Sequence, residues 1–266
     1  MSSARPRVSV VTVNFNMADA IAGTLDSILA QDHPNFESIV IDGGSTDGSR
    51  EIIAAYGPRL GYWASERDRN LYDAMNKGIA AATGEWVLFM NAGDRFAAPN
   101  VLSRIFAGLH READILYGDH IRRYSAPQID RKVPAESPDV LPLRMHCSHQ
   151  AMLMRRQLLV DRPFALDLLV ADYDVILAAY VGGKRFERVD CVVAVTAQGG
   201  RSDSQRFRAL GERAMLVRRN GLMTPAVAFH YGRLYLRTAL ALALKRVLPE
   251  SLRTAILRHR PIKGMG

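Results

Sequence analysis

The first 120 residues alternate between short apolar runs and segments whose apolar residues recur at helical spacing. The clearest run, Val8–Val13, is rich in β-branched side chains and carries no charge, as expected for a strand buried on both faces. Because parallel strands need crossover connections, the alternation predicts an α/β fold with a mostly parallel, Rossmann-like sheet and helices on both faces. The predicted strands cover residues 8–13, 36–41, 60–64, 86–90 and 115–117. The predicted helices cover residues 19–30, 71–82 and 100–109, with one more that Ser45 or Thr46 caps and that ends near Tyr56.

The pattern loosens after Gly118. Prolines at 127, 134, 138 and 142 predict irregular excursions and edge strands. Residues 149–182 are expected to be helical in two pieces and 186–195 to form a strand, and helices are expected at 202–220 and 225–248.

The positive charge of the chain is concentrated at its C-terminal end. From residue 201 onward there are fourteen Lys and Arg against three Asp and Glu, whereas residues 1–200 are slightly acidic. Segment 225–248 mixes leucines and tyrosines with four cations and His230, which makes it a poor membrane crossing. We expect a basic amphipathic tail that lies on an anionic membrane surface. The alternatives are a solvated face that keeps the protein soluble, or a helix packed on its own core or on a second subunit.

Two cysteines form no disulfide framework or zinc motif, and the N-terminal residues do not resemble a signal peptide. We therefore expect reduced thiols and a cytoplasmic protein, peripheral on the cytoplasmic face of the inner membrane.

Three polar loops follow predicted strands: 14–17, 42–48 and 91–94. In open α/β sheets ligands bind at the carboxyl ends of the strands, and a nucleotide is the usual ligand. Asp42 ends one strand and precedes glycines that allow close backbone approach. The Gly-x-Gly-x-x-Gly and Gly-Lys-Ser/Thr motifs are absent, which argues against a dinucleotide oxidoreductase and a P-loop phosphotransferase.

Further candidates each have a structural explanation beside the functional one. Asp94 is placed to hold Mg²⁺ or Mn²⁺ against a diphosphate, or else to cap the next helix. Asp172 opens a helical segment, where a simple N-cap is the better explanation from residue chemistry alone. A lone histidine such as His149 is more often a structural hydrogen-bond donor than a catalyst, and segment 198–202 is either a loop that closes over a phosphate or a hinge.

Several motifs occur together in a fixed order: Val8–Asn16, Asp42–Ser49, Ser65–Asp68 and Leu71–Trp86. With these motifs, residues 6–202 resemble glycosyltransferase family 2, the inverting enzymes of GT-A fold. The resemblance implies one GT-A domain over residues 1–202, with a nucleotide-binding half at 1–118 and an acceptor half at 119–202, followed by the basic amphipathic helical tail at 203–266.

The resemblance also implies roles for individual residues. Asp172 is the implied general base and Asp94 the implied ligand of Mg²⁺ or Mn²⁺. The implied nucleotide and donor-sugar residues are Thr12, Asn14, Asp42, Gly44, Asp73, Asn76, Asn91 and Asp94. The implied acceptor or lid residues are His149, Gln150, Asp174, Gly199 and Gly200. In the metal motif Asn91 and Gly93 stand where the family has further acids, and Asn70 stands where relatives often have Gly.

The predicted function is inverting transfer of a sugar from a nucleoside-diphosphate sugar, with UDP-sugar favoured, to a lipid-linked glycan in bacterial cell-surface polysaccharide synthesis. The partners implied are the donor, the acceptor glycan, the inner-membrane surface and a second copy in a homo-oligomer. One alternative is a sugar nucleotidyltransferase, although segment 14–16 lacks the Gly-rich cationic loop that such an enzyme needs. Another is a non-catalytic sugar-nucleotide-binding or scaffolding subunit, which the thinned metal motif favours. No recognised nucleic-acid-binding fold accompanies the basic tail, so no nucleic-acid partner is expected.

Overall fold

The computed structural model describes residues 7–108, 110, 112–125, 128–197 and 205–247. Its strands are β1 (Val8–Asn14), β2 (Phe36–Asp42), β3 (Tyr62–Ser65), β4 (Trp86–Phe89), β5 (Arg95–Phe96), β6 (Ile115–Ser125), β7 (Gln128–Val133), β8 (Met152–Arg155) and β9 (Phe186–Ala197). Its helices are α1 (Ala18–Leu29), α2 (Ser49–Tyr56), α3 (Leu71–Ala81), α4 (Val101–Ile105), α5 (Arg156–Asp161), α6 (Ala171–Val181), α8 (Arg206–Arg219) and α9 (Pro225–Val247). Short 3₁₀ turns form at Gly57–Arg59, Pro138–Val140 and His149–Ala151.

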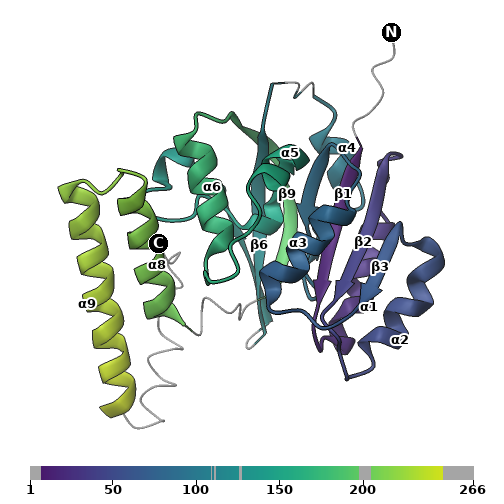
Figure 1. Cartoon of the computed structure of the whole chain (residues 1–266), viewed down its shortest axis with the longest axis horizontal. Helices are drawn as coiled ribbons and strands as arrows, with labels where there is room; N and C mark the ends of the chain where they lie inside the picture. The colour runs from purple at the N-terminus through teal and green to yellow at the C-terminus, as the bar shows by residue number, and fades with distance from the viewer. Residues whose placement is uncertain (1–6, 109, 111, 126–127, 198–204, 248–266) are drawn as a thin grey trace.

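The described strands form one sheet in the order β3-β2-β1-β4-β8-β6-β9-β5, with β7 paired to β6 (Figure 1). The pairs β3–β2, β2–β1 and β1–β4 are parallel, whereas β8 runs antiparallel between β4 and β6. Strand β9 is again parallel to β6. The predicted α/β fold with a mostly parallel sheet is therefore confirmed.

The sheet is buried on both faces, as the uninterrupted apolar runs predict. Val11 and Ile39 pack in a core with α3 and α6, while Val10 and Leu88 point to the other face, toward α4. Ile21 and Leu25 of α1 pack there with Ile53 of α2. Alternate residues of one strand thus supply both cores, because successive side chains of a strand point to opposite faces.

Strand β8 was predicted to be helical, and that prediction was wrong. A run of four apolar and basic residues, Met152–Arg155, is too short for its periodicity to distinguish strand from helix. The neighbouring strands make this segment a strand. Leu153 lies opposite Leu88 of β4 and Leu116 of β6, so the backbone of β8 pairs with a strand on each side.

Two smaller expectations also change. Helix α4 covers only Val101–Ile105, shorter than the predicted 100–109. Helix α2 is preceded by Gly48 in the left-handed region, at φ 93°, and no side chain caps it, so the predicted cap by Ser45 or Thr46 was wrong. The Ser45 hydroxyl bonds to Asp42 instead.

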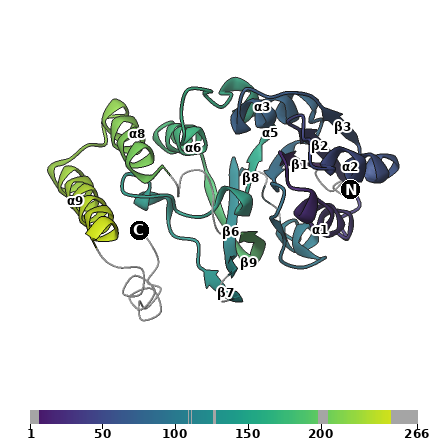
Figure 2. The same cartoon turned by 90° about the horizontal axis from the view of Figure 1, so that it is seen from below.

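The C-terminal helices α8 and α9 lie beside each other at the α6 end of the molecule, away from α1 and α2 (Figures 1 and 2). Ala209, Leu216 and Val217 of α8 belong to the same buried cluster as α6, as do Val227 and Tyr231 of α9. The opposite side of α9 is exposed, with Phe229, Leu236 and Leu240 among its largest exposed apolar side chains. None of the helices in the described part of the chain is long and apolar enough to cross a membrane.

Candidate active site

Polar side chains from distant segments meet at one edge of the sheet. This edge holds the carboxyl ends of β1, β2, β3 and β4. Because β8 is antiparallel, the turn His149–Ala151 that precedes it lies at the same edge. The loops after β1 and β4 are joined directly, since the Ala92 amide donates to the Val13 carbonyl at 3.0 Å. The three loops predicted to form one site are therefore neighbours.

Asp42 is fully buried and organises the loop that follows β2. Its Oδ1 accepts from Asn14 Nδ2 at 2.7 Å and from the Ser45 hydroxyl at 2.5 Å. Its Oδ2 accepts from the Ser65 hydroxyl at 2.6 Å and the Ser45 amide at 3.0 Å. Burial raises the pKa of this carboxyl, but the hydrogen bonds from Ser45, Ser65 and Asn14 outweigh it and the pKa is lowered. Asp42 is thus an ionised anchor whose oxygens already accept four protein hydrogen bonds.

Three buried oxygens beside this anchor have no hydrogen-bond partner among the described residues: Thr12 Oγ1, Asn14 Oδ1 and Asp68 Oδ2. Asp68 Oδ2 lies 3.1 Å from the point where a Cβ on Gly43 would stand. Gly44 takes a φ of 79°, and a side chain there would meet the backbone of Arg67. Buried polar atoms in folded proteins are nearly always paired, so these oxygens mark where a polar ligand would bind.

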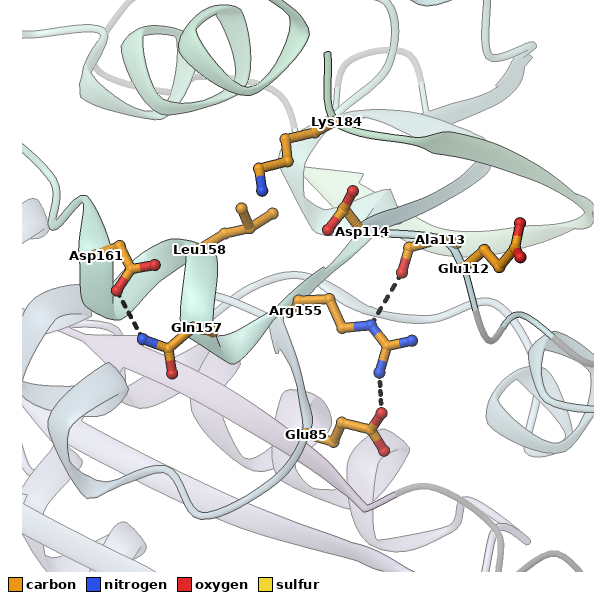
Figure 3. A pocket seen from close by; sticks show the side chains of 9 residues that line it. All are labelled: Glu85, Glu112, Ala113, Asp114, Arg155, Gln157, Leu158, Asp161 and Lys184. Atoms are coloured by element: carbon orange, nitrogen blue, oxygen red, sulfur yellow. Dashed lines mark hydrogen bonds and ion pairs between the residues drawn. The ribbon is translucent and has the colours of Figure 1, made fainter. Parts of the chain in front are cut away.

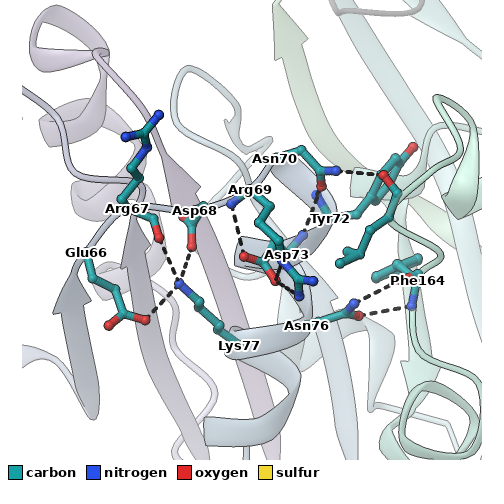
Figure 4. Close-up of polar contacts among 11 residues, drawn as sticks. Glu66, Arg67, Asp68, Arg69, Asn70, Tyr72, Asp73, Asn76, Lys77 and Phe164 are labelled. Carbon is teal, nitrogen blue, oxygen red and sulfur yellow. Dashed lines mark hydrogen bonds and ion pairs between the residues drawn. The ribbon is translucent and has the colours of Figure 1, made fainter.

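The start of α3 forms a second polar cluster (Figure 4). Asn70 caps the helix by accepting from the amides of Tyr72 and Asp73 at 2.9 and 3.1 Å. Asp73 accepts from the Arg69 guanidinium at 2.7 Å, and the hydrogen bonds from Arg69 hold its pKa low. The Asn70 side chain also donates to the Leu166 carbonyl at 2.7 Å. Asn70 thus caps α3 and connects it to the segment before α6.

The Asn76 side chain binds the backbone of a residue distant in the sequence, Phe164. Its Oδ1 accepts from the Phe164 amide and its Nδ2 donates to the Phe164 carbonyl, both at 2.9 Å (Figure 4). Lys77, one position on, pairs with Asp68 at 2.5 Å and Glu66 at 2.7 Å. Asn76 was expected to face the donor sugar, whereas its amide here joins α3 to the segment that leads to α6.

Asp94 lies 7% exposed at the end of the β4 loop. Gln150 Nε2 donates to its Oδ2 at 2.8 Å, and the Ala197 amide donates to its Oδ1 at 3.0 Å. Burial is the main influence on this carboxyl and raises its pKa. The position does not cap α4, so the alternative explanation for Asp94 was wrong. Gln150 links Asp94 to the turn that carries His149.

His149 and Asp172 form an ion pair at the centre of the site. Their Nδ1 and Oδ2 atoms are 3.2 Å apart, and about a fifth of each side chain is exposed. Tyr72 donates to Asp172 Oδ1 at 2.9 Å, and Asn91 Nδ2 lies 3.3 Å from His149 Nε2. Burial alone would raise the pKa of Asp172, but His149 and Tyr72 together lower it to about 2. Burial lowers the pKa of His149, whereas Asp172 and Asp94 raise it above its ordinary value.

Of the remaining predicted residues, one makes a separate ion pair and two lie outside the residues that the structure describes. Asp174 is buried and pairs with Arg162 at 2.8 Å. Gly199 and Gly200 lie outside the described residues.

The divalent cation that the family resemblance implies would have a suitable first ligand in Asp94. Within the described residues no group of three or more His, Cys, Asp or Glu side chains is arranged to hold a metal. Asp94 nevertheless retains acceptor capacity on both oxygens, and the buried Asn91 Oδ1 has no partner. Mg²⁺ and Mn²⁺ prefer such oxygen ligands, and Mg²⁺ commonly uses one or two carboxylates together with substrate phosphates. The residues fit a metal that a diphosphate would help to bind.

A separate depression of about 410 Å³ lies at the opposite edge of the sheet, where β4 and β6 begin (Figure 3). Arg155 pairs there with Glu85 and donates to the Ala113 carbonyl, and Gln157 donates to Asp161. These polar groups bind one another, and the depression lies away from the three loops at the other ends of the strands.

Several residues that build the site were not among the predicted site residues. Ser45 and Ser65 hold Asp42, Tyr72 holds Asp172, and Asp68 offers a free buried oxygen. Asp68 lies in the motif Ser65–Asp68 and Tyr72 in the motif Leu71–Trp86. Their place in these motifs could have marked them as site residues. No local signal marks Ser65 as a partner of Asp42, because that contact forms only when β3 pairs with β2.

Comparisons with known proteins identify the family of this chain. The glycosyl transferase family 2 model matches residues 9–161, more than half of the chain. A PGL/p-HBAD biosynthesis glycosyltransferase of Mycobacterium bovis is 36% identical over 160 residues, which span 58% of this chain and 61% of that relative. A putative teichuronic acid biosynthesis glycosyltransferase of Bacillus subtilis, TuaG, is 35% identical over 99 residues, or 36% of this chain and 39% of that protein. The chain therefore matches about three fifths of the length of its mycobacterial relative.

Solved structures show the same fold at low sequence identity. Staphylococcus aureus TarS 1–349 in complex with UDP-GlcNAc superimposes with a TM-score of 0.64 at 20% identity, covering 79% of this chain and 66% of that one. The mannosyltransferase PcManGT of Pyrobaculum calidifontis in complex with GDP-Man and Mn²⁺ has a TM-score of 0.59 at 21% identity, covering 95% and 83%. The fold is GT-A, and the chain belongs to glycosyl transferase family 2.

Proposed function

We propose that this glycosyltransferase transfers a sugar from a nucleoside-diphosphate sugar to a lipid-linked glycan in bacterial cell-surface polysaccharide synthesis, with inversion at the anomeric carbon. The observation that carries the proposal is the short chain of contacts from Asp94 through Gln150 and His149 to Asp172. Asp94 and Asp172 thus contact neighbouring residues of one turn, and we assign Asp94 to the side of the diphosphate. A single-displacement transfer needs one group at the leaving diphosphate and one at the attacking hydroxyl.

Asp172 would act as the general base. The acceptor hydroxyl oxygen bonds to the anomeric carbon while the bond from that carbon to the diphosphate oxygen breaks, and the hydroxyl proton passes to Asp172. With a pKa of about 2 the carboxylate is ionised at neutral pH. Tyr72, His149 and the Tyr173 amide donate to its oxygens, and a carboxylate that accepts three hydrogen bonds retains capacity for one from the acceptor hydroxyl.

On the donor side, Thr12, Asn14 and Asp68 would bind the nucleoside through their unpartnered oxygens, with Asp42 holding the loop. The exposed ring of Phe15, 64% accessible, offers a face for stacking a base. Asp94 and Asn91 would hold Mg²⁺ or Mn²⁺, which when bound neutralises charge on the departing diphosphate. Asp73 is proposed to lie near the ribose or sugar.

The names of relatives support this reading of the donor. TarS has been solved with UDP and with UDP-GlcNAc, and PcManGT with GDP-Man and Mn²⁺. The mycobacterial relative is named for PGL/p-HBAD biosynthesis and the Bacillus relative for teichuronic acid biosynthesis. We favour a UDP-sugar as donor.

The donor is tested by thermal unfolding of the full chain with UDP-, GDP- and dTDP-sugars, each with and without Mn²⁺. One nucleotide series should raise the unfolding temperature, because a ligand at 100 times its Kd stabilises the folded protein by about 2.7 kcal/mol. The rise should be larger with Mn²⁺, which would help to hold the diphosphate. Asp94→Asn should remove the Mn²⁺-dependent part and leave the unliganded protein folded. If no sugar nucleotide shifts the transition, the proposed function is wrong.

We further propose that α9 brings the enzyme to its lipid-linked acceptor from the cytoplasmic face of the membrane. Phe229, Leu236 and Leu240 are exposed on the helix, and the exposed Arg233 and Arg237 lie among them. An apolar stripe beside cations suits an anionic lipid surface. Vesicles with anionic lipid should pull down the wild-type protein, and Phe229→Ser with Leu236→Ser should release it. A dimer without vesicle binding would instead indicate that a second copy covers this face.

A further inference from the structure

Asp172 lies in the first turn of α6, and no side chain at the N-cap position caps this helix. Val170, at the N-cap position, makes no side-chain cap hydrogen bond. The first turn of any helix leaves amide groups without intrahelical acceptors, and these must be satisfied from elsewhere. The position of Asp172 therefore depends on what holds residues 167–170.

Helix α8 holds that segment from one side. Glu212 Oε2 accepts from the amides of Leu169 and Val170 at 2.6 and 3.2 Å. Arg208, one turn earlier on α8, donates to the Asp167 carbonyl at 3.0 Å and to Glu212 Oε1 at 2.8 Å. Two side chains of a C-terminal helix thus bind three backbone groups immediately before the base.

Tyr72 of α3 holds the same segment from the other side. Its hydroxyl lies 3.0 Å from the Leu169 carbonyl and 2.9 Å from Asp172 Oδ1. The amide of Leu169 is bound by α8 and its carbonyl faces α3, so this residue is fixed between two helices. Leu169 and Val170 are themselves buried, at 9% and 2% exposed.

Helix α8 is well placed to act as a rigid support. Ala209, Leu216 and Val217 are buried in the cluster that contains α6. The Arg213 guanidinium lies over the ring of Tyr173, the neighbour of Asp172, at 5.7 Å from the ring centre. Glu212 is 14% exposed at its side chain, so its bonds to the loop are largely shielded from water.

We propose that Glu212 is a positioning residue for the transfer reaction, and that α8 is thereby part of the catalytic apparatus. The carboxylate ties the loop before α6 to α8 and keeps Asp172 at the attacking hydroxyl. This inference rests on the proposed role of Asp172 as the base. A displacement of about 1 Å at a reacting group can cost about 100-fold in rate, so loss of one support is expected to be visible.

The test compares Glu212→Ala and Glu212→Gln with Asp190→Asn, a change at an exposed acid of β9. Glu212→Ala should lower kcat at least about 10-fold while KM for the donor and the donor-induced thermal shift stay unchanged. Glu212→Gln keeps one acceptor oxygen and should retain more of kcat than the alanine variant. Asp190→Asn should match wild type. A general loss of folding would instead lower the unfolding temperature and donor binding together.

The same change is then made in Asp172→Asn. If Glu212 acts through the base, Glu212→Ala should lower kcat little further in that background. A full additional drop would overturn the inference and indicate a general structural role, as would unchanged kcat in wild-type background. Should Asp172→Asn itself keep wild-type activity, the proposed function is at fault rather than the positioning role.

Discussion

The loops proposed to bind the donor and the helix that carries Asp172 are built in opposite ways. Around Asp42 the partners come from adjacent parallel strands, since Asn14, Asp42 and Ser65 end β1, β2 and β3 side by side. Around Asp172 the partners are Tyr72 and His149, with Glu212 holding the loop before it, and these come from three separate elements. The sheet thus positions the first cluster, whereas the second depends on packing between helices.

This difference predicts different sensitivities. A cluster set by strand register tolerates changes in the helices around it, because the ladder of backbone bonds stays in place. A base held by side chains of other helices shifts whenever one of those helices moves. We therefore expect perturbations of the first region to affect donor binding and stability, and perturbations of the second to affect turnover.

The largest effect is expected at Asp172. Asp172→Asn removes the proposed proton acceptor and keeps the side-chain shape, so kcat should fall about 100- to 10,000-fold. Affinity for the donor should persist, because the donor loops are untouched. Steady-state kinetics with calorimetric measurement of donor binding would check both. Loss of donor binding in proportion to kcat would contradict the separation of the two regions.

At Asp42, substitution by Asn should lower stability and donor affinity together. The new amide would face the donors Asn14, Ser45 and Ser65, leaving buried groups mismatched at a cost of about 1–3 kcal/mol. Urea unfolding would measure the loss, and titration with the nucleotide would measure affinity. An unchanged unfolding midpoint would show that Asp42 is less central to the loop than its four hydrogen bonds indicate.

His149→Gln should change the pH dependence. Asp172 has a pKa of about 2 in the folded protein against an ordinary value of 3.8, so its ionisation stabilises the fold above that range and the benefit is lost as pH falls toward 2. Without the imidazolium its pKa should rise, and the acid limb of kcat should move to higher pH by about one unit. Rate profiles at several pH values test this. A limb that stays in place would mean that His149 does not set the charge state of Asp172.

The smallest effect on turnover is expected at Asn76. Asn76→Ala removes two hydrogen bonds to the Phe164 backbone and should cost about 1–3 kcal/mol of stability. Turnover at temperatures well below unfolding should fall only slightly, and donor affinity should hold. Thermal unfolding and donor titration give the two readouts. A clear loss of donor affinity at constant stability would restore the donor-sugar role that the sequence motif implies.

Much of the donor region follows from the sequence. The apolar runs predict β1, β2 and β4, and polar residues at their ends predict where ligands meet, because parallel strands place their carboxyl ends at one edge. His149 and Gln150 were also named as candidates, through the family resemblance, although the turn that carries them was not predicted. Strand β8 was missed because four residues carry too little periodic signal, and its identity came from two neighbouring strands.

Asp94 and Asp172 show most clearly how far the sequence alone predicts the site. Local pattern placed Asp94 after a buried strand and Asp172 at a helix start, and chain order alone determined both. Only the tertiary structure decided that Gln150 and His149 connect them, that Tyr72 binds Asp172, and that Glu212 of α8 binds the loop before it. Strand and helix patterns depend on neighbours in the chain, whereas these contacts join residues up to 100 positions apart and exist only after the helices pack.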